Sequence, residues 1–281
     1  MRILISHVSE YRYDGPPAST VQALRLRPAA AKGQTILHWT IEAPGIKDAA
    51  TYTDGFGNRV DLVSGAADAS SVVVHAHGEV ETEDNGGVAG WTDEAVAPGA
   101  FLRVNAVTKA SEAIAALAEN ARDPDRLATL HDLMAAIGKH MEYVTDSTDA
   151  QTTAAAAFEA RRGVCQDYAH IFIAACRHLE IPARYVTGYL LLEDQSAGPA
   201  HHAWAEALVD HIGWVGFDAT NDLCPTERYV RLGSALDAAS AAPIRGVRTA
   251  LGTESLTVTV AVHEVAQSQS QSQSQSQSQS Q

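Results

Sequence analysis

The chain has 281 residues, of which 46% are hydrophobic and 19% are charged, a composition typical of a folded protein with one large or two modest domains. Its formal net charge of −14 would repel a phosphate backbone, so we do not expect nucleic-acid binding. No stretch approaches the ~20 apolar residues of a membrane-spanning helix, so we expect no membrane partner either.

The chain contains three cysteines, an odd number with no CxxC pair: Cys165, Cys176 and Cys224. This pattern fits neither a disulfide framework nor a structural zinc site, and it favours a reducing compartment. The N-terminus lacks the apolar core and small-residue cleavage site of a signal peptide. We therefore expect a cytoplasmic protein with at least one free thiol to explain.

The first hundred residues have the pattern of a strand-rich domain. Short runs of β-branched and apolar residues alternate with turn clusters such as 14–17 and 54–58, and no helical stripe is sustained. We predict a sandwich-like β domain over residues 1–100 without chemistry of its own. Its expected strands are 21–26, 36–41, 59–63 and 71–79.

After about residue 100 the pattern becomes mixed. Helices are expected at 104–121, after Asp123-Pro124-Asp125, and at 152–179 with an interruption at 161–163. Strands are expected at 184–192, 202–209 and 214–218, and an alternating run at 256–262 suggests an edge strand whose placement the sequence leaves open. We therefore predict an α+β core over 101–266. A strict Gln-Ser alternation at 267–281 has nothing to bury and should form a disordered tail.

Cys165 is the cysteine best placed for chemistry. Gly163 can adopt the positive φ of a sharp turn, and the residues from Cys165 to Leu179 are apolar almost all round, as in a buried helix. A thiol at a helix N-terminus is favoured as thiolate, and the free N–H groups there could stabilise an oxyanion. A single cysteine is more often a small buried hydrophobe, which is what we expect of Cys176. Cys224 has no obvious base beside it.

A catalytic thiol needs a base, and the base needs an orienting partner. If the hairpin turns around Asp210, His202 and Asp218 become a directly opposed pair on one face of the sheet. The carboxylate would then hold Nδ1 of the imidazole and leave Nε2 for the thiol. Because a strand alternates faces, only one of His201 and His202 can point at Cys165, and the pairing favours His202.

Three other polar residues are assigned weaker or structural roles. His170 lies five residues into the helix and should be a hydrogen-bonded structural histidine. Asp167 is expected to cap or brace the helix start, and Glu206 is an alternative partner carboxylate.

Three ordered motifs closely resemble the bacterial transglutaminase-like core: GVCQDYAH (163–170), HAWAE (202–206) and GWVGFDAT (213–220). The segment IPARYVTGY (181–189) resembles the helix-to-strand connection of this family, and LRLRP (24–28) with DGFGN (54–58) resembles its β-rich N-terminal domain. The family's catalytic Cys, His and Asp fall on Cys165, His202 and Asp218. Ala219 stands where the family usually has proline, which should alter the strand end and leave the chemistry intact.

The resemblance implies a papain-like α+β core, with the catalytic cysteine at the N-terminus of a helix that packs on an antiparallel sheet. It also implies a thioester acyl-enzyme formed from a peptide or protein amide, with no cofactor or metal. Hydrolysis would make the protein a cysteine peptidase or amidase, whereas transfer to an amine would make it a transglutaminase. We favour hydrolysis, because no amine site is recognisable. No tryptophan lies between Trp91 and Cys165 to serve as the second oxyanion donor of animal transglutaminases, and Tyr143 is a candidate.

Two alternatives remain open. The protein could be a peptide-binding module that keeps the fold without catalysis. A metalloenzyme using Cys165, His170, His201 and His202 would match no familiar zinc spacing, and no acidic loop resembles a calcium-binding EF-hand.

Overall fold

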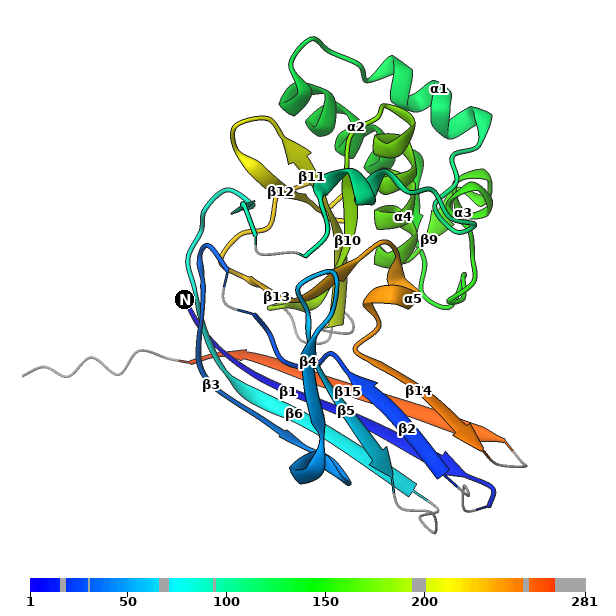
Figure 1. Ribbon diagram of the computed structural model, residues 1–281. Coiled ribbons are helices and arrows are strands. Elements are labelled where there is room, and N and C mark those ends of the chain that lie inside the picture. Colours follow the sequence, from blue (N-terminus) through cyan, green and yellow to red (C-terminus); the bar gives the residue numbers. More distant parts are fainter. Residues whose placement is uncertain are drawn as a thin grey trace, which may run out of the picture.

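The computed structural model describes residues 1–15, 19–29, 31–65, 71–92, 95–193, 201–249 and 253–265. The expected Gln-Ser tail at 267–281 lies outside these residues. Figure 1 shows strands gathered in layers at one end of the molecule and helices packed on a further sheet at the other. The α+β architecture predicted from the sequence is confirmed. In the described part of the chain, no helix is both long enough and apolar enough to cross a membrane.

The first sheet is antiparallel and has the strand order β15-β1-β6-β3. Alternate residues of β6, such as Val72, Val74 and Ala76, are buried, as a sheet with one face on a core requires. On β1 the alternate buried positions hold Ile3 and Ile5 but also the polar His7 and Ser9. The polar residues hide the two-residue period, so this strand was not predicted from the sequence. The strands are β1 (Arg2–Tyr13), β3 (Gln34–Glu42), β6 (Ser71–Thr82) and β15 (Glu254–Glu264).

The second sheet faces the first and has the order β14-β2-β5-β4. One apolar core joins the two sheets, with Ile5 and Val74 from the first and Leu24 and Val63 from the second. Its strands are β2 (Ser19–Leu24), β4 (Ala50–Thr53), β5 (Arg59–Gly65) and β14 (Ile244–Thr249), and the short helix η1 (Ile46–Asp48) precedes β4.

The two last strands belong to these N-terminal sheets. β15 pairs with β1 along its length, as in Ile5 opposite Val262, and β14 pairs with β2. The chain therefore returns from the helical half to complete both layers, which places the 256–262 run at a sheet edge (Figure 1).

The third sheet carries the helices. It is an antiparallel half-barrel with the order β13-β10-β11-β12-β7. Helix α4 packs on it through Ile171 and Phe172, which share a core with Ala203, Ala205 and Phe217. Its strands are β7 (Val88–Gly90), β10 (Ala183–Leu190), β11 (His201–Val209), β12 (Gly213–Phe217) and β13 (Tyr229–Ala235).

The helices begin at side-chain caps. Ser111 accepts a hydrogen bond from the N–H of Ile114 at the start of α1, and Asp125 accepts one from Leu127 at the start of α2. The expected helix at 104–121 starts later than predicted, because Asn105 Oδ1 binds the N–H and hydroxyl of Thr108 in a competing local turn. The helices are η2 (Pro98–Leu102), α1 (Glu112–Asn120), α2 (Arg126–His140), α3 (Ala154–Ala160), α4 (Cys165–His178) and α5 (Ala238–Ala241), and two short parallel strands, β8 (Glu142–Tyr143) and β9 (Arg162–Gly163), precede α4.

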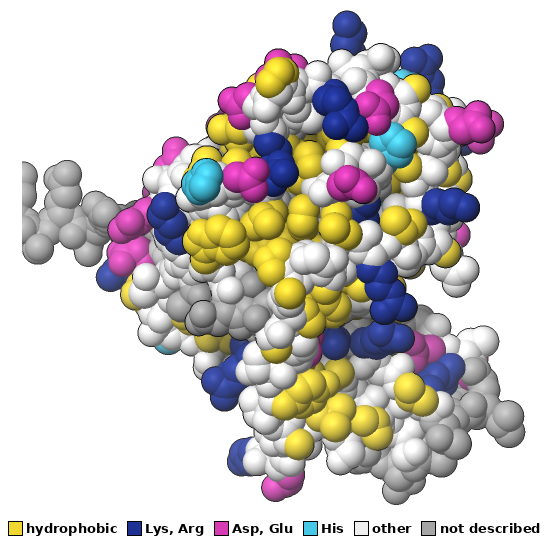
Figure 2. Space-filling view, turned by 45° about the horizontal axis from the view of Figure 1, so that its top comes forward, with side chains coloured by type: hydrophobic (Ala, Val, Ile, Leu, Met, Phe, Trp, Pro, Cys, Tyr) yellow, Lys and Arg dark blue, Asp and Glu magenta, His cyan; other side chains and the backbone are white. Residues whose placement is uncertain are grey.

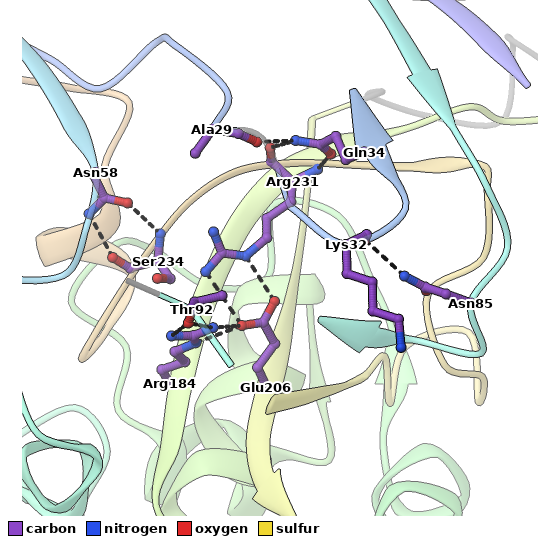
Figure 3. A network of polar contacts seen from close by, with 10 residues as sticks. All are labelled: Ala29, Lys32, Gln34, Asn58, Asn85, Thr92, Arg184, Glu206, Arg231 and Ser234. Atoms are coloured by element: carbon purple, nitrogen blue, oxygen red, sulfur yellow. Dashed lines mark hydrogen bonds and ion pairs between the residues drawn. The ribbon is translucent and has the colours of Figure 1, made fainter. Parts of the chain in front are cut away.

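Two amide side chains fasten the N-terminal sheets to the edge strand β13 (Figure 3). Gln34 donates to the carbonyl of Arg231 at 2.8 Å and accepts from its N–H at 2.7 Å. Asn58 does the same for Ser234, with both distances 2.8 Å. Each amide thus occupies backbone groups that an edge strand leaves unpaired, and the two halves of the molecule are held in a defined orientation.

The surface of the helical half mixes charges with apolar area. Figure 2 shows a continuous band of apolar side chains across this face, with basic and acidic side chains interspersed around it. The excess of acidic residues is therefore not gathered into one acidic field on this face.

Candidate active site

Cys165 is the first residue of α4, and a small set of contacts fixes its position. Asp167 Oδ2 accepts hydrogen bonds from the N–H of Val164 at 2.8 Å and from the hydroxyl of Thr148 at 2.6 Å. Asp167 therefore braces the helix start, as expected. Gly163 has no positive φ, which corrects its expected role. A Cβ there would lie 2.7 Å from Cβ of Asp167, so glycine makes room for the brace.

His202 and Asp218 are in contact, although not through the expected pairing. His202 Nε2 lies 2.6 Å from Asp218 Oδ2. In the observed register Leu208 faces Trp214, and its continuation sets Asp218 opposite Trp204. The turn is centred on His211, one residue later than predicted, so the register is shifted by two positions. A shift of two keeps both side chains on the same face, and the contact survives.

The two ring nitrogens of His202 have the opposite roles to those expected. Asp218 lies opposite Trp204, two residues along the strand from His202. The imidazole therefore reaches the carboxylate with its outer nitrogen, Nε2. Cys165 also interacts with the His202 imidazole and raises its pKa, and Nδ1 is the ring nitrogen that Asp218 leaves for this interaction. The structure thus brings Cys165, His202 and Asp218 into one continuous chain of contacts.

Asp218 is almost fully buried and receives four hydrogen bonds. Its Oδ2 accepts from His202, from Asn221 Nδ2 at 2.7 Å and from the hydroxyl of Tyr229 at 2.8 Å. Its Oδ1 accepts from the N–H of Thr220 at 3.0 Å. Sequence reasoning missed Asn221 and Tyr229. Asn221 lies three residues after Asp218, which was an available signal, whereas nothing in the sequence indicates Tyr229.

The hydrogen bonds of His202 and Asp218 determine the ionisation state of both side chains. Burial alone would lower the pKa of His202, but its hydrogen bonds to Asp218 and Cys165 outweigh burial and raise the pKa to about 10. Burial opposes ionisation of Asp218, yet the hydrogen bonds from His202, Tyr229 and Asn221 lower its pKa. Both groups are therefore held in their charged forms.

The other two histidines of the sequence analysis lie in different surroundings. His201 Nε2 is 2.9 Å from the hydroxyl of Thr187, and burial, reinforced by His202, lowers its pKa to about 4. His170 is buried, and its Nε2 accepts a hydrogen bond from the N–H of Ala238 at 3.1 Å. Burial lowers its pKa to about 4. His170 is thus a hydrogen-bonded structural histidine, as predicted.

Glu206 is engaged elsewhere, so it is not the partner of His202. Its carboxylate lies 2.6 Å from Arg184 and 2.9 Å from Arg231 (Figure 3). Burial raises the pKa of both Cys176, which is fully buried, and Cys224.

Cys165 opens onto a cleft of about 480 Å³ between the helical half and the N-terminal sheets. One wall comes from α4, β10 and β11, and the other comes from the inner faces of β1 and β15. The N-terminal sheets therefore help to build the site. The lining residues include Cys165, Tyr185, His201, Tyr11, Leu256 and Val258.

Tyr143 lies at the same cleft. β8 pairs Tyr143 with Gly163, two residues before Cys165. Burial raises the pKa of its hydroxyl, and the charges of Cys165 and Asp218 add to the increase. Tyr143 is thus close enough to the thiol and the carboxylate to interact with both electrostatically.

Comparisons with known proteins agree with this architecture. The family model of the transglutaminase-like superfamily matches residues 113–219, and that of the bacterial transglutaminase-like N-terminal region matches residues 3–81. Uncharacterized proteins of Mycobacterium leprae and Mycobacterium tuberculosis are 28% and 27% identical over 94% and 88% of this chain, and over 99% and 87% of their own lengths. A solved structure described as a "Putative Cysteine Protease" from Cytophaga hutchinsonii is 25% identical, with a TM-score of 0.72 over 95% of this chain and 92% of that one. This chain therefore contains a transglutaminase-like superfamily core at residues 113–219, preceded by a bacterial transglutaminase-like N-terminal region at residues 3–81.

Proposed function

We propose that this protein is a cysteine hydrolase that cleaves amide bonds of peptides or proteins through a thioester intermediate. Cys165 is the nucleophile, His202 the general base and acid, and Asp218 the residue that orients the imidazole. The observation that carries the proposal is the chain of contacts from Cys165 through His202 to Asp218, which opens onto a substrate-sized cleft. The cysteine-protease description of the Cytophaga structure supports it as an analogy.

The mechanism follows from the positions of the three side chains. In the resting site the imidazolium of His202 already holds the thiol proton on Nδ1, and the thiolate sulfur attacks the amide carbonyl to form a tetrahedral intermediate. The imidazolium then returns this proton to the leaving amine as the C–N bond breaks, which leaves a thioester on Cys165. Water, deprotonated by His202, attacks the thioester and releases the acid and the thiol. Asp218 stays ionised throughout and stabilises the imidazolium.

Two sources of hydrogen bonds serve the oxyanion in this mechanism. The first backbone N–H groups of α4 have no acceptor within the helix, and they lie beside the sulfur of Cys165. The hydroxyl of Tyr143 is the second donor. One such donor typically contributes 10²–10³-fold to kcat, and a partly exposed tyrosine should contribute less. We expect Tyr143→Phe to lower kcat by about tenfold with little change in KM.

The cleft favours an extended peptide with an apolar side chain. Leu256 and Val258 on β15 are 51% and 49% exposed, and they line the cleft together with Tyr11 and Ile244. β15 is also an edge strand, and edge strands can pair with an extended peptide backbone. The N-terminal sheets would thus select the substrate that the helical half cleaves.

Water is the favoured acceptor of the acyl group from the thioester. Cys165 is partly exposed, and the cleft above it is open to solvent. Efficient transfer to an amine requires exclusion of water from the thioester. Access of water to the thioester therefore makes hydrolysis the expected outcome.

The test is a peptide-library digest read by mass spectrometry, with and without an added primary amine. We expect cleavage next to apolar residues. Cys165→Ser should reduce the rate by about 10³-fold or more, and the matched control Cys224→Ser, at the other partly exposed thiol, should retain it. Amine-linked products in excess of hydrolysis would identify a transglutaminase instead. Peptide binding without turnover, unchanged in Cys165→Ala, would identify a binding module.

A further inference from the structure

Three side chains with metal-binding atoms converge on the outer face of the first sheet. Glu42 lies on β3, and His75 and His77 lie on β6; one ligand atom from each falls within 4.8 Å of the others. His75 and His77 are two residues apart on one strand, so they project from the same face. Glu42 is the cross-strand partner of His75. The backbone of two adjacent strands thus brings the three groups together.

A fourth residue orients the nearest imidazole. Ser6 Oγ on β1 lies 2.9 Å from His75 Nε2, which leaves His75 Nδ1 to face Glu42 Oε2 at 3.8 Å. His77 Nε2 lies 3.8 Å from the other carboxylate oxygen, Oε1. This is the arrangement of metal-binding histidines, in which one ring nitrogen is held by a neighbouring polar group and the other is directed at the ion.

The ligand chemistry selects the class of ion. Two imidazole nitrogens and one carboxylate oxygen suit Zn²⁺, whereas Ca²⁺ and Mg²⁺ prefer all-oxygen sites. Bonds of about 2 Å in a tetrahedral site place ligand atoms about 3.3 Å apart. The observed 3.8 Å separations are slightly longer, and the side chain of Glu42, which is 67% exposed, can move to close them. Water would fill the fourth position.

We propose that Glu42, His75 and His77 form a zinc-binding site, with Ser6 as its positioning residue. The site is separate from the thiol chemistry. Its residues lie on the outer face of the sheet, whereas His7 and Ser9 on the inner face of the same sheet line the cleft of Cys165. The proposal therefore does not rest on the proposed function.

The experiment is calorimetric titration of the chelator-treated protein with ZnCl₂, in a Cys165→Ser background that removes the reactive thiol as a competing ligand. We expect one ion per chain with micromolar affinity, and a melting temperature that rises with zinc concentration. His75→Ala and His77→Ala should each weaken binding by about 30-fold or more, and Ser6→Ala by about tenfold.

The matched control is His38→Ala. His38 is an exposed histidine beside Glu79 on the same sheet, and its loss should leave the affinity unchanged. Equal melting temperatures of all variants without zinc would show that they fold. Absence of zinc binding by the parent protein would overturn the proposal. Binding that survives both His75→Ala and His77→Ala would overturn it as well.

Discussion

Two buried carboxylates on the half-barrel sheet have opposite surroundings. Glu206 lies between the guanidinium groups of Arg184 and Arg231, which stay charged at every accessible pH. Asp218 has one ionisable cationic partner, His202, and otherwise receives hydrogen bonds from neutral groups. Only the imidazole can give and accept a proton near neutral pH. The difference in partner separates a structural ion cluster from a group that can support catalysis.

The surroundings differ in the same sense. The Arg184 guanidinium also stacks on the ring of Trp214 at 4.1 Å, and the cluster adjoins the amide contacts that fasten the N-terminal sheets to β13 (Figure 3). His202 instead contacts Cys165 at the cleft. Removal of the negative charge at Asp218 should therefore affect catalysis, whereas its removal at Glu206 should affect stability.

The largest expected effect is on catalysis at Asp218. Asp218→Asn should lower kcat/KM by about 10⁴-fold, because an amide cannot stabilise the imidazolium and can favour the wrong tautomer. Steady-state kinetics on a cleaved peptide would measure this loss, with circular dichroism as the control for folding. Activity within tenfold of the parent protein would show that Asp218 does not orient the base.

The counterpart change should affect stability instead. Glu206→Gln removes the carboxylate charge that Arg184 and Arg231 share, and we expect it to lower the free energy of unfolding by about 3–5 kcal/mol. Urea denaturation would measure the loss. Any remaining folded enzyme should keep its kcat. A stable variant with a greatly reduced kcat would mean that Glu206 belongs to the reactive site.

A smaller loss of stability is expected at the junction of the two halves. Asn58→Ala removes both hydrogen bonds to the backbone of Ser234 and should cost about 2 kcal/mol. Asn85→Ala is the matched control, because Asn85 donates to the carbonyl of Lys32 at an exposed position. Its effect should stay within about 0.5 kcal/mol. Equal losses for the two variants would contradict the junction's role.

The smallest expected effect is the pH dependence of stability. The pKa of His202 rises from 6.5 to about 10 on folding, so its protonation stabilises the fold fully below pH 6.5, and this contribution disappears as the pH rises through about 10. Asp218 stays ionised over this range, because its pKa is lowered. Between about pH 7 and 9.5, the parent protein should lose at least about 1 kcal/mol more than His202→Gln. Parallel pH profiles would contradict the raised pKa.

The sequence predicted the local elements well, because their determinants are local. Motif order and helix periodicity located α4 and the strands of the half-barrel. The pairing of His202 with Asp218 depended on a turn in which His211 and Gly213 adopt positive φ, and no residue pattern there fixed the turn length. The predicted register was therefore wrong, although a shift of two positions kept the side chains of His202 and Asp218 on the same face of the sheet.

Longer-range features were less accessible from the sequence. β15 pairs with β1, from the other end of the chain, and no local signal encodes that partner. Tyr229 reaches Asp218 from a different strand. Likewise, His7 and Ser9 look like breaks in an apolar strand, whereas the structure places them at the cleft. Residues that serve a site between two layers interrupt the pattern from which a strand is predicted.

The central claim is that Cys165, His202 and Asp218 form one assembled, reactive site. Its most direct test is site-mapped alkylation at mildly acidic pH, which follows Cys165, Cys176 and Cys224 separately by mass spectrometry in the parent protein and in His202→Gln. We predict that Cys165 alone reacts rapidly, because an imidazolium partner favours its thiolate, and that the reaction slows sharply in His202→Gln. A Cys165 that reacts no faster than Cys224, or equally fast without His202, would contradict the claim.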